Sequence, residues 1–335
     1  MSDDQQGGVK LPQRLLPIPA SISPQAQAAL RRMVNADGVP VNALHAMPAP
    51  DDLDGWQRVK AGADAWYAES LGEGLAAVRA GVQTIAAGSA TIYVAHPAQP
   101  ISADCALVDL HGGALVFGGG DACRASTRLQ ADQYGLACYG VDYRMPPEHP
   151  YPAALDDCLA AYRHVLAHHA PERIAVAGRS AGGNLAAALL LRARDEGLPL
   201  PAAVVLLSPE ADLTESGDSF ALNQLADVVL PGSLMANNLL YAGGADLAHP
   251  YLSPLFGDFA PGFPPTLLQS GTRDLFLSNT VRMHRALRGA GIEAELHVFE
   301  AMPHGGFMGA PEDEELVREV ARFLRTRLGI QSKPS

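Results

Sequence analysis

The chain has 335 residues, of which 48% are hydrophobic and 18% are charged, so it can fill a sizeable core and is not intrinsically disordered. Its 24 basic and 36 acidic residues give a net charge of −12 at pH 7, which argues against nucleic acid or an anionic membrane as a partner, because phosphate contacts need a basic surface. The length fits one large α/β domain with an extra element, or two unequal domains.

The cysteines and the N-terminus indicate where the protein resides. Cys105, Cys123, Cys138 and Cys158 have no C-x-x-C spacing, which predicts buried thiols in a reducing compartment rather than a disulfide framework or a zinc site. Residues 1–6 are polar and acidic, unlike the start of a signal peptide. No apolar run reaches the roughly 18 residues of a membrane span. We therefore expect a cytoplasmic protein without a membrane partner.

The N-terminal part of the chain is expected to form an arm followed by helices. Residues 1–20 are polar and then proline-rich, which predicts a loose arm. Ser23 followed by Pro24 is a typical helix start, and Gly38 is expected to end that segment. Residues 52–81 carry apolar and aromatic side chains at mixed helical spacing, and these either join the core or line a pocket under a lid.

From residue 82 onward, short apolar runs alternate with helical patterns. Expected strands cover residues 82–85, 90–94, 106–110, 136–143, 173–177, 202–207, 266–269 and 295–299. Expected helices cover residues 122–134, 152–168, 183–195, 278–289 and 312–328. The first two strands are expected to pair antiparallel, and the alternation beyond them predicts a parallel sheet covered by helices on both faces. The Gly-, Pro- and Asn-rich stretch 211–262 interrupts this rhythm, as a lid over a site often does.

The strongest chemical signal is the G-x-S-x-G sequence around Ser180, which lies between an expected strand and an expected helix. This pattern is typical of a nucleophile elbow, a turn so sharp that side chains at Gly178 and Gly182 would clash. Arg179 completes the elbow on the strand side. The nucleophile would then lie at a helix N-terminus, which favours developing negative charge. A plain glycine-rich turn is the alternative interpretation.

A second signal, His111-Gly112-Gly113-Ala114, follows the strand 106–110. Backbone amides that must reach a substrate oxygen need glycine, because a Cβ atom blocks close approach. The amides of Gly112, Gly113 and Ala114, together with that of Ala181, are the candidate oxyanion hole. His111 belongs to this turn, so it is expected to organise the loop rather than to act as a base.

A serine hydroxyl needs a base, and the base needs a carboxylate to orient it. Among eleven histidines, only His304 lies in a Pro-His-Gly-Gly loop after a strand and before the last helix. Asp274 follows the strand 266–269 at its carboxyl end, where open parallel sheets bind ligands. Glu210 and Asp212 are the competing acids, because they follow the strand next to the elbow strand. The predicted catalytic residues are Ser180, His304 and Asp274.

Residues 82–328 resemble the bacterial hormone-sensitive-lipase-like carboxylesterases (family IV) of the α/β-hydrolase superfamily. The resemblance rests on His111-Gly112-Gly113, on the segment 142–153 (DYRMPPEHPYPA), on Ser180-Ala181-Gly182-Gly183-Asn184, on Ser253-Pro254-Leu255, and on Asp274 and His304. The order Ser180, Asp274, His304 is also that of the α/β-hydrolase fold. The resemblance implies an α/β-hydrolase fold with an eight-stranded, mostly parallel sheet, helices on both faces and a helical cap.

The domain organisation follows from the same resemblance. Residues 1–81 are expected to form the N-terminal arm and cap helices, residues 82–330 the catalytic domain, and residues 331–335 a tail. The stretch 211–262 is expected to add a second cap element.

Three positions depart from the family pattern. Ala114 stands where a third glycine is usual, and its amide can still donate. Arg179 stands where Asp or Thr is usual, and Glu210 stands where an uncharged residue is often found. We considered that Arg179 and Glu210 pair across the two strands, the alternative being a solvated Arg179.

The sequence therefore predicts a serine carboxylesterase that needs no metal or organic cofactor. The family resemblance implies small esters with short or medium acyl chains as its substrates. A lactone, aryl-formamide or amide hydrolase with the same triad is the alternative, and a non-catalytic ligand binder is a more distant one. The strand at 294–299 is the last in the sequence and contains no proline, so it is expected at a sheet edge that could pair two chains into a homodimer, as the family resemblance also implies. The alternative is that Glu295 and His297 solvate this edge and keep the chain monomeric.

Overall fold

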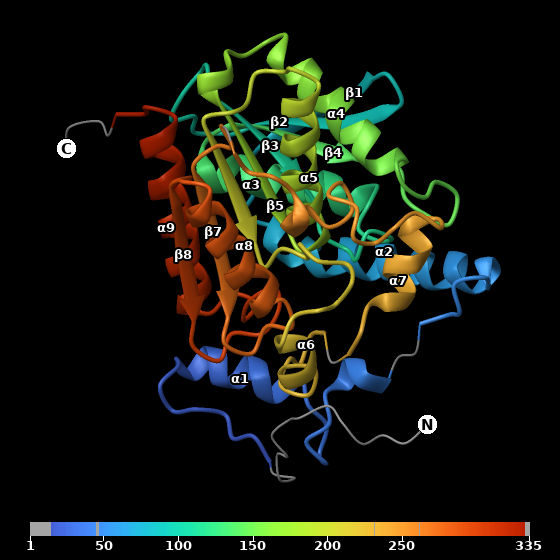
Figure 1. Cartoon of the computed structure of the whole chain (residues 1–335). Coiled ribbons are helices and arrows are strands. Elements are labelled where there is room, and N and C mark those ends of the chain that lie inside the picture. Colours follow the sequence, from blue (N-terminus) through green and yellow to red (C-terminus); the bar gives the residue numbers. More distant parts are fainter. Residues whose placement is uncertain (1–14, 45–46, 231, 261, 332–335) are drawn as a thin grey trace.

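An eight-stranded sheet forms the centre of the molecule (Figure 1), in the order β1-β2-β4-β3-β5-β6-β7-β8. The computed structural model describes residues 15–44, 47–230, 232–260 and 262–331. The strands are β1 (Gly81–Ala87), β2 (Ala90–His96), β3 (Ala106–Leu110), β4 (Ala137–Asp142), β5 (Ile174–Arg179), β6 (Ala203–Leu207), β7 (Thr266–Gly271) and β8 (Ala294–Phe299). Strand β2 runs antiparallel to both neighbours, and every other neighbouring pair is parallel. The predicted mostly parallel sheet is confirmed.

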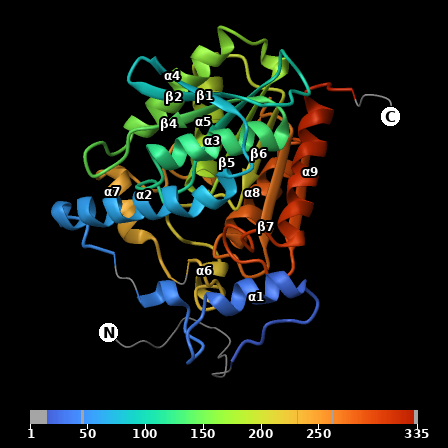
Figure 2. The ribbon, with the colours of Figure 1, turned by 180° about the vertical axis from the view of Figure 1, so that it is seen from behind.

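Helices cover both faces of this sheet, as Figures 1 and 2 show from opposite sides. The helices of the sheet layers are α3 (Asp121–Tyr134), α4 (Ala153–Leu166), α5 (Ala181–Asp195), α8 (Leu277–Gly289) and α9 (Pro311–Arg327). Side chains of α4, α5 and α8 share one hydrophobic cluster with alternate strand residues such as Val176 and Leu206. Side chains of α3 and α9 share a second cluster with the intervening residues, such as Ala175 and Val205. This division follows from the two-residue period of a strand.

The N-terminal segment and the 211–262 stretch lie at the carboxyl ends of the central strands. Their helices are α1 (Pro24–Arg32), α2 (Leu53–Leu75), α6 (Ser219–Leu222) and α7 (Met235–Ala242), and they also contain the short 3₁₀ turns η1 (Val41–Leu44) and η3 (Pro254–Phe256). A third 3₁₀ turn, η2 (Pro171–Arg173), precedes β5. Figures 1 and 2 both show α1 and α6 side by side at one end of the molecule, beyond the arrowhead of β7. These elements are positioned to cover whatever lies at the strand ends.

Local sequence signals placed the first helices well. The Ser23 hydroxyl caps α1 by accepting the Ala26 N–H at 3.1 Å. The helix ends at Arg32, earlier than Gly38, because the chain then folds back through a bridge between Val34 and Pro40. In α2, the side chain of Trp56 is fully buried, whereas that of Trp66 is 55% exposed. The aromatic residues of this segment thus divide between core and surface.

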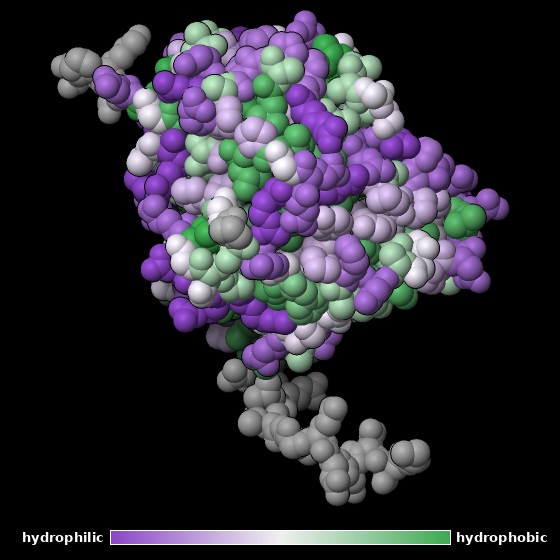
Figure 3. All heavy atoms as spheres, turned by 45° about the horizontal axis from the view of Figure 1, so that its top comes forward, coloured by the Kyte–Doolittle hydropathy of each residue, from purple (hydrophilic) through white to green (hydrophobic). Residues whose placement is uncertain are grey.

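The surface carries both polar and apolar residues. On the face shown in Figure 3, groups of hydrophobic residues are separated by hydrophilic ones. Among the described residues, no helix has the length and apolar character needed to cross a bilayer. The four cysteines are buried free thiols, as the sequence predicts.

Candidate active site

Ser180 lies in the sharp turn that joins β5 to α5. Its backbone has φ 58° and ψ −123°, a conformation that residues with a side chain rarely adopt. A Cβ atom at Gly178 would lie 2.1 Å from the Gly182 carbonyl oxygen, and one at Gly182 would lie 1.9 Å from the Leu110 carbonyl oxygen. The turn therefore requires both glycines, and it holds Ser180 in a strained conformation at the N-terminus of a buried helix.

A chain of hydrogen bonds connects Ser180, His304 and Asp274, which come from three separate loops. Nδ1 of His304 lies 3.0 Å from Oδ1 of Asp274, and Nε2 lies 2.9 Å from Oγ of Ser180. A carboxylate accepts only, so Nδ1 carries the proton, and the Ser180 hydroxyl donates to the lone pair on Nε2. The side chain of Asp274 is fully buried, while Ser180 and His304 are each 7% exposed. The arrangement can withdraw a proton from the Ser180 hydroxyl.

The Asp274 carboxylate is held in place from two further directions. Ser270 donates to Oδ2 at 2.6 Å, and the Phe276 N–H donates to Oδ1 at 3.0 Å. Burial by itself raises the pKa of Asp274, but the His304 imidazole and these hydrogen bonds outweigh burial and hold the pKa below its usual value. Asp274 thus stays ionised, as a residue that orients an imidazole must.

The two competing acids do not contact His304. Asp212 accepts hydrogen bonds from Thr214 and Ser216 and forms an ion pair with Arg282 at 2.7 Å. Glu210 is 1% exposed, and its amide donates to the Ser180 carbonyl at 3.1 Å. Glu210 therefore lies beside the elbow, but neither acid is part of the hydrogen-bonded chain at His304.

The considered pair between Arg179 and Glu210 does not form among the described side chains. Arg179 instead donates to the Gly305 carbonyl at 3.4 Å, and its charge acts on Asp109. Arg179 has the same parity on β5 as Ala175 and therefore points to the α3 and α9 face of the sheet. The Glu210 backbone is held by Asn184 of α5, which lies on the opposite face. The idea failed because adjacency of two strand ends does not fix the face on which each side chain lies.

The burial of Glu210 gives a prediction about stability. Burial, with a smaller contribution from Glu215, raises the pKa of Glu210 from 4.5 to about 8. Such an acid stabilises the fold fully below the unfolded-state pKa, and this contribution is lost as the pH rises through the folded-state pKa. Each pH unit between the unfolded-state and folded-state pKa of Glu210 lowers the free energy of unfolding by about 1.4 kcal/mol.

We expect Glu210→Gln to lose less stability than the wild type between about pH 5 and pH 8, as read from urea unfolding at both pH values. Other buried acids titrate in both proteins, so only the difference between the two proteins reports on Glu210. Equal losses in the two proteins would show that Glu210 ionises normally.

The His111–Ala114 turn lies directly against the elbow. A Cβ atom at Gly112 would lie 3.1 Å from the Arg179 carbonyl oxygen and 3.3 Å from the Ser180 Cβ atom. Gly113 has φ 124°, and Ala114 has φ 51°, a conformation that disfavours its side chain. Within the described part of the chain, the amides of Gly113, Ala114 and Ala181 have no hydrogen-bond acceptor. These amides are thus free to donate to a substrate oxygen.

His111 and Tyr143 fix the shape of this turn. Nδ1 of His111 lies 2.7 Å from the Gly112 carbonyl oxygen, and the Tyr143 hydroxyl donates to the His111 carbonyl at 2.7 Å. The two rings stack with centroids 4.1 Å apart. Burial lowers the pKa of His111, which favours the neutral ring. The expected role of His111 in organising the loop agrees with these contacts.

Sequence reasoning missed Asp227, a buried residue of the 211–262 stretch. Its carboxylate accepts the amides of Leu275, Val229 and Leu230 and lies 3.2 Å from the amide nitrogen of His304. It thereby connects the insertion to the loops that carry the acid and the histidine. A lone aspartate in a polar insertion carries no sequence pattern by which it could have been found.

Asp227 is expected to influence the pH dependence of any reaction that needs a neutral His304. Burial, and then the charge of Asp274, raises the pKa of Asp227 to about 6, so at neutral pH it adds a negative charge near His304. We expect Asp227→Asn to shift the acid limb of kcat/KM to lower pH, by about half a pH unit to one unit, because imidazolium loses a favourable charge.

The pH profile should be compared with that of Asp218→Asn, an exposed residue of the same insertion. A purely structural role for Asp227 would lower kcat without moving the acid limb, and that result would contradict the electrostatic role.

Comparison with known proteins identifies the fold and the family. A family model described as the alpha/beta hydrolase fold matches residues 107–308. An acetyl-hydrolase from Streptomyces hygroscopicus is 37% identical over 232 residues, which are 67% of this chain and 76% of that protein. The crystal structure of the esterase E25 superposes with a TM-score of 0.88 at 33% identity, covering 97% of this chain and 99% of that one.

A further solved structure indicates which family within the superfamily the chain resembles. An esterase described as belonging to the bacterial hormone-sensitive lipase family has a TM-score of 0.78 at 30% identity, with 92% of this chain and 99% of that chain covered. The eight-stranded sheet, the elbow at Ser180 and these similarities lead to one assignment. The chain belongs to the bacterial hormone-sensitive-lipase-like esterases of the α/β-hydrolase superfamily.

Proposed function

We propose that the protein is a serine carboxylesterase that hydrolyses small esters with short to medium acyl chains, with Ser180, His304 and Asp274 as its catalytic triad. The observation that carries the proposal is the continuous hydrogen-bonded chain from Ser180 through His304 to Asp274. Names of similar proteins, an acetyl-hydrolase and several esterases, support ester hydrolysis as the activity.

In this proposal, His304 takes the proton of Ser180 as Oγ attacks the ester carbonyl. The same proton is then given to the leaving alcohol, and the acyl group stays on Ser180. A water molecule, activated by His304 in the same way, releases the acid. Asp274 holds the imidazole tautomer and stabilises the imidazolium form. Every proton in the cycle passes through groups of the chain or through water.

The negative charge on the substrate oxygen would be met by backbone amides. We assign this role to Gly112, Gly113, Ala114 and Ala181, which lie on the two turns that meet at Ser180. Removing one such donor typically costs about 3 to 4 kcal/mol of transition-state stabilisation. The glycines matter because their missing side chains leave space beside Ser180 for the substrate carbonyl.

A chain-length series of p-nitrophenyl esters tests the proposed activity. We expect kcat/KM to be highest for short or medium acyl chains and to fall for long ones. The same preparation should be assayed with lactones and formanilides, which the triad could also attack. Faster turnover of one of those classes would replace the ester assignment, and turnover of none would favour a ligand-binding role.

We further propose that the described residues of the segment 1–81 and of the stretch 211–262 form a cap over the catalytic residues of the domain at 82–330. Residues 1–14 of the expected arm lie outside the described residues. The two cap segments contact each other and the catalytic loops: Asn42 donates to the Val229 carbonyl at 2.8 Å, and Leu30 of α1 clusters with Val228 and Phe307. Trp56 of α2 clusters with Leu240 of α7 and with Phe117. Phe117 follows the His111–Ala114 turn, which we call the oxyanion turn. The tail at 331–335 falls almost entirely outside the described residues.

A homodimer through β8 is the assembly that we propose. Strand β8 is the last strand in the sheet order and so lies at an edge, and its Val298 side chain is 42% exposed. A two-fold axis could pair two such edges antiparallel. Light scattering should give about twice the chain mass of 35.2 kDa, and Val298→Pro should return the single mass. A single mass for the wild type at all concentrations would exclude the dimer.

A further inference from the structure

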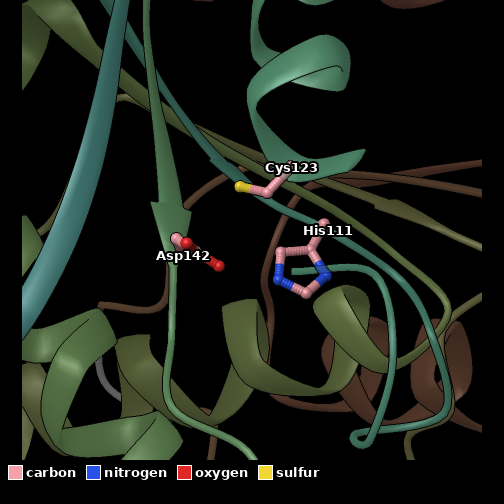
Figure 4. Close-up of side chains that lie close together, drawn as sticks. All are labelled: His111, Cys123 and Asp142. Carbon is pink, nitrogen blue, oxygen red and sulfur yellow. The ribbon is translucent and has the colours of Figure 1, made fainter. Parts of the chain in front are cut away.

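Three potential metal ligands converge behind the oxyanion turn (Figure 4). One ligand atom each of His111, Cys123 and Asp142 lies within 4.8 Å of the others. His111 follows β3, Asp142 ends β4, and Cys123 lies in the first turn of α3. Strands β3 and β4 are parallel neighbours whose register pairs Leu110 with Val141, so the residues that follow lie side by side at the carboxyl edge.

The hydrogen bonds of His111 determine which of its nitrogens can bind a metal. Nδ1 lies 2.7 Å from the Gly112 carbonyl oxygen, which can only accept, so Nδ1 carries the proton. Nε2 therefore presents a lone pair. This atom is buried and has no hydrogen-bond partner among the described residues, and the ring is only 7% exposed. A metal-binding histidine commonly shows this pattern, with its other N–H donated to a backbone carbonyl.

The Asp142 carboxylate faces the imidazole, as Figure 4 shows. Its Oδ1 accepts the Gly120 N–H at 2.9 Å, and its Oδ2 lies 3.2 Å from the Tyr93 hydroxyl. These contacts fix the orientation of the carboxylate. An imidazole lone pair and a carboxylate facing each other in a buried place repel, and a cation between them would remove that repulsion.

We propose that His111 Nε2, Cys123 Sγ and Asp142 form a binding site for one divalent cation of the Zn²⁺ type. Nitrogen and sulfur ligands favour such metals over Mg²⁺ or Ca²⁺, which take oxygen ligands. As the metal–sulfur bond forms, the thiol releases its proton to solvent. One dication, one thiolate and one carboxylate then sum to zero charge, which suits a buried site. Three protein ligands leave the fourth tetrahedral position open for water.

A cavity of about 620 Å³ adjoins this site at Asp142, while His111 and Cys123 lie behind its lining. It is lined by Asp142 itself, by Gly119 and Gly120, which directly precede α3, and by Lys60 and Asp64 of α2, but by none of Ser180, His304 and Asp274. The cation would thus enter from the side of Asp142 and remain apart from the nucleophile. Because His111 also bonds the Gly112 carbonyl, a bound cation would act on catalysis by altering the oxyanion turn.

Cobalt titration of the untagged, metal-free chain tests the site. Co²⁺ bound by a thiolate gives a charge-transfer band in the near ultraviolet, which distinguishes Cys123 from surface histidines. We expect the band to saturate at one equivalent and to disappear when Zn²⁺ displaces Co²⁺. Cys123→Ala should abolish the band, whereas Cys138→Ala, which removes another buried thiol, should retain it.

A second measurement covers the case in which a cysteine variant folds poorly. Zn²⁺ should raise the Tm of the wild type and of Ser180→Ala, and Asp142→Asn should need at least about tenfold more Zn²⁺ for the same rise. Ser180→Ala also separates this proposal from the proposed esterase activity. Absence of the band in the wild type, its persistence in Cys123→Ala, or an unchanged Zn²⁺ response in Asp142→Asn would overturn the site.

Discussion

Ser180→Ala is expected to lower kcat for p-nitrophenyl esters by about 10⁵- to 10⁶-fold, because removal of a triad nucleophile abolishes the step that the other members assist. His304→Ala should cost about as much, since the residues act as a unit. Initial-rate assays with the substrate series measure both effects, and circular dichroism should show an unchanged fold. Ser102→Ala, at a half-buried serine whose hydroxyl donates to Asp104, is the control and should retain full activity. A Ser180→Ala variant with more than a small fraction of the wild-type kcat would mean that another nucleophile acts.

Asp274→Asn is expected to lower kcat by about 10⁴-fold while largely preserving the geometry. The asparagine amide can donate to Nδ1 of His304, and this would place the imidazole proton on Nε2. A protonated Nε2 can no longer accept the proton of Ser180. The same assay measures the effect.

Asp212→Asn is the matched control for Asp274→Asn, because Asp212 is also fully buried and bonded to polar side chains. We expect this variant to lose stability through its broken ion pair with Arg282 but to keep its turnover number. Near wild-type turnover in Asp274→Asn, together with loss in an Asp212 or Glu210 variant, would show that Asp274 is not the acid.

The predictions for the buried acids Asp227 and Glu210 complement the expected losses of kcat in the triad variants. Asp227→Asn tests whether the 211–262 stretch influences His304 through charge, and Glu210→Gln tests the cost of a buried carboxyl beside the elbow. Neither change removes a group that we expect to touch the substrate. Together with the variants of Ser180, His304 and Asp274, these two variants distinguish groups proposed to react from groups that act only through their charge or burial.

The sequence by itself determined the elbow, because the chemistry of that turn is local. Gly178 and Gly182 are needed by the backbone within a few residues of Ser180, so their spacing is visible in the chain. The same holds for Gly112 and Gly113, whose small size serves a close approach of two turns. Short, nearly continuous apolar runs between helical patterns were enough to predict the parallel sheet, because strands buried on both faces have that composition.

The tertiary structure alone decided which distant side chains meet and on which face they lie. Arg179 and Glu210 follow neighbouring strands, yet the two-residue alternation of β5 turns Arg179 to the α3 and α9 face. Asp227 reaches His304 only because the insertion folds back over the strand ends. Such contacts depend on the path of the whole chain and leave no spacing in the sequence.

Cys123 is the clearest example of a contact that the sequence does not reveal. The absence of a C-x-x-C spacing argued against a zinc site, since spacing reports only on ligands that share one loop or helix turn. The structure places Cys123 beside His111 and Asp142 because α3 begins where β3 and β4 end. Local backbone requirements are therefore readable from the chain, whereas convergence of side chains from separate elements is set by packing, which only the folded structure specifies.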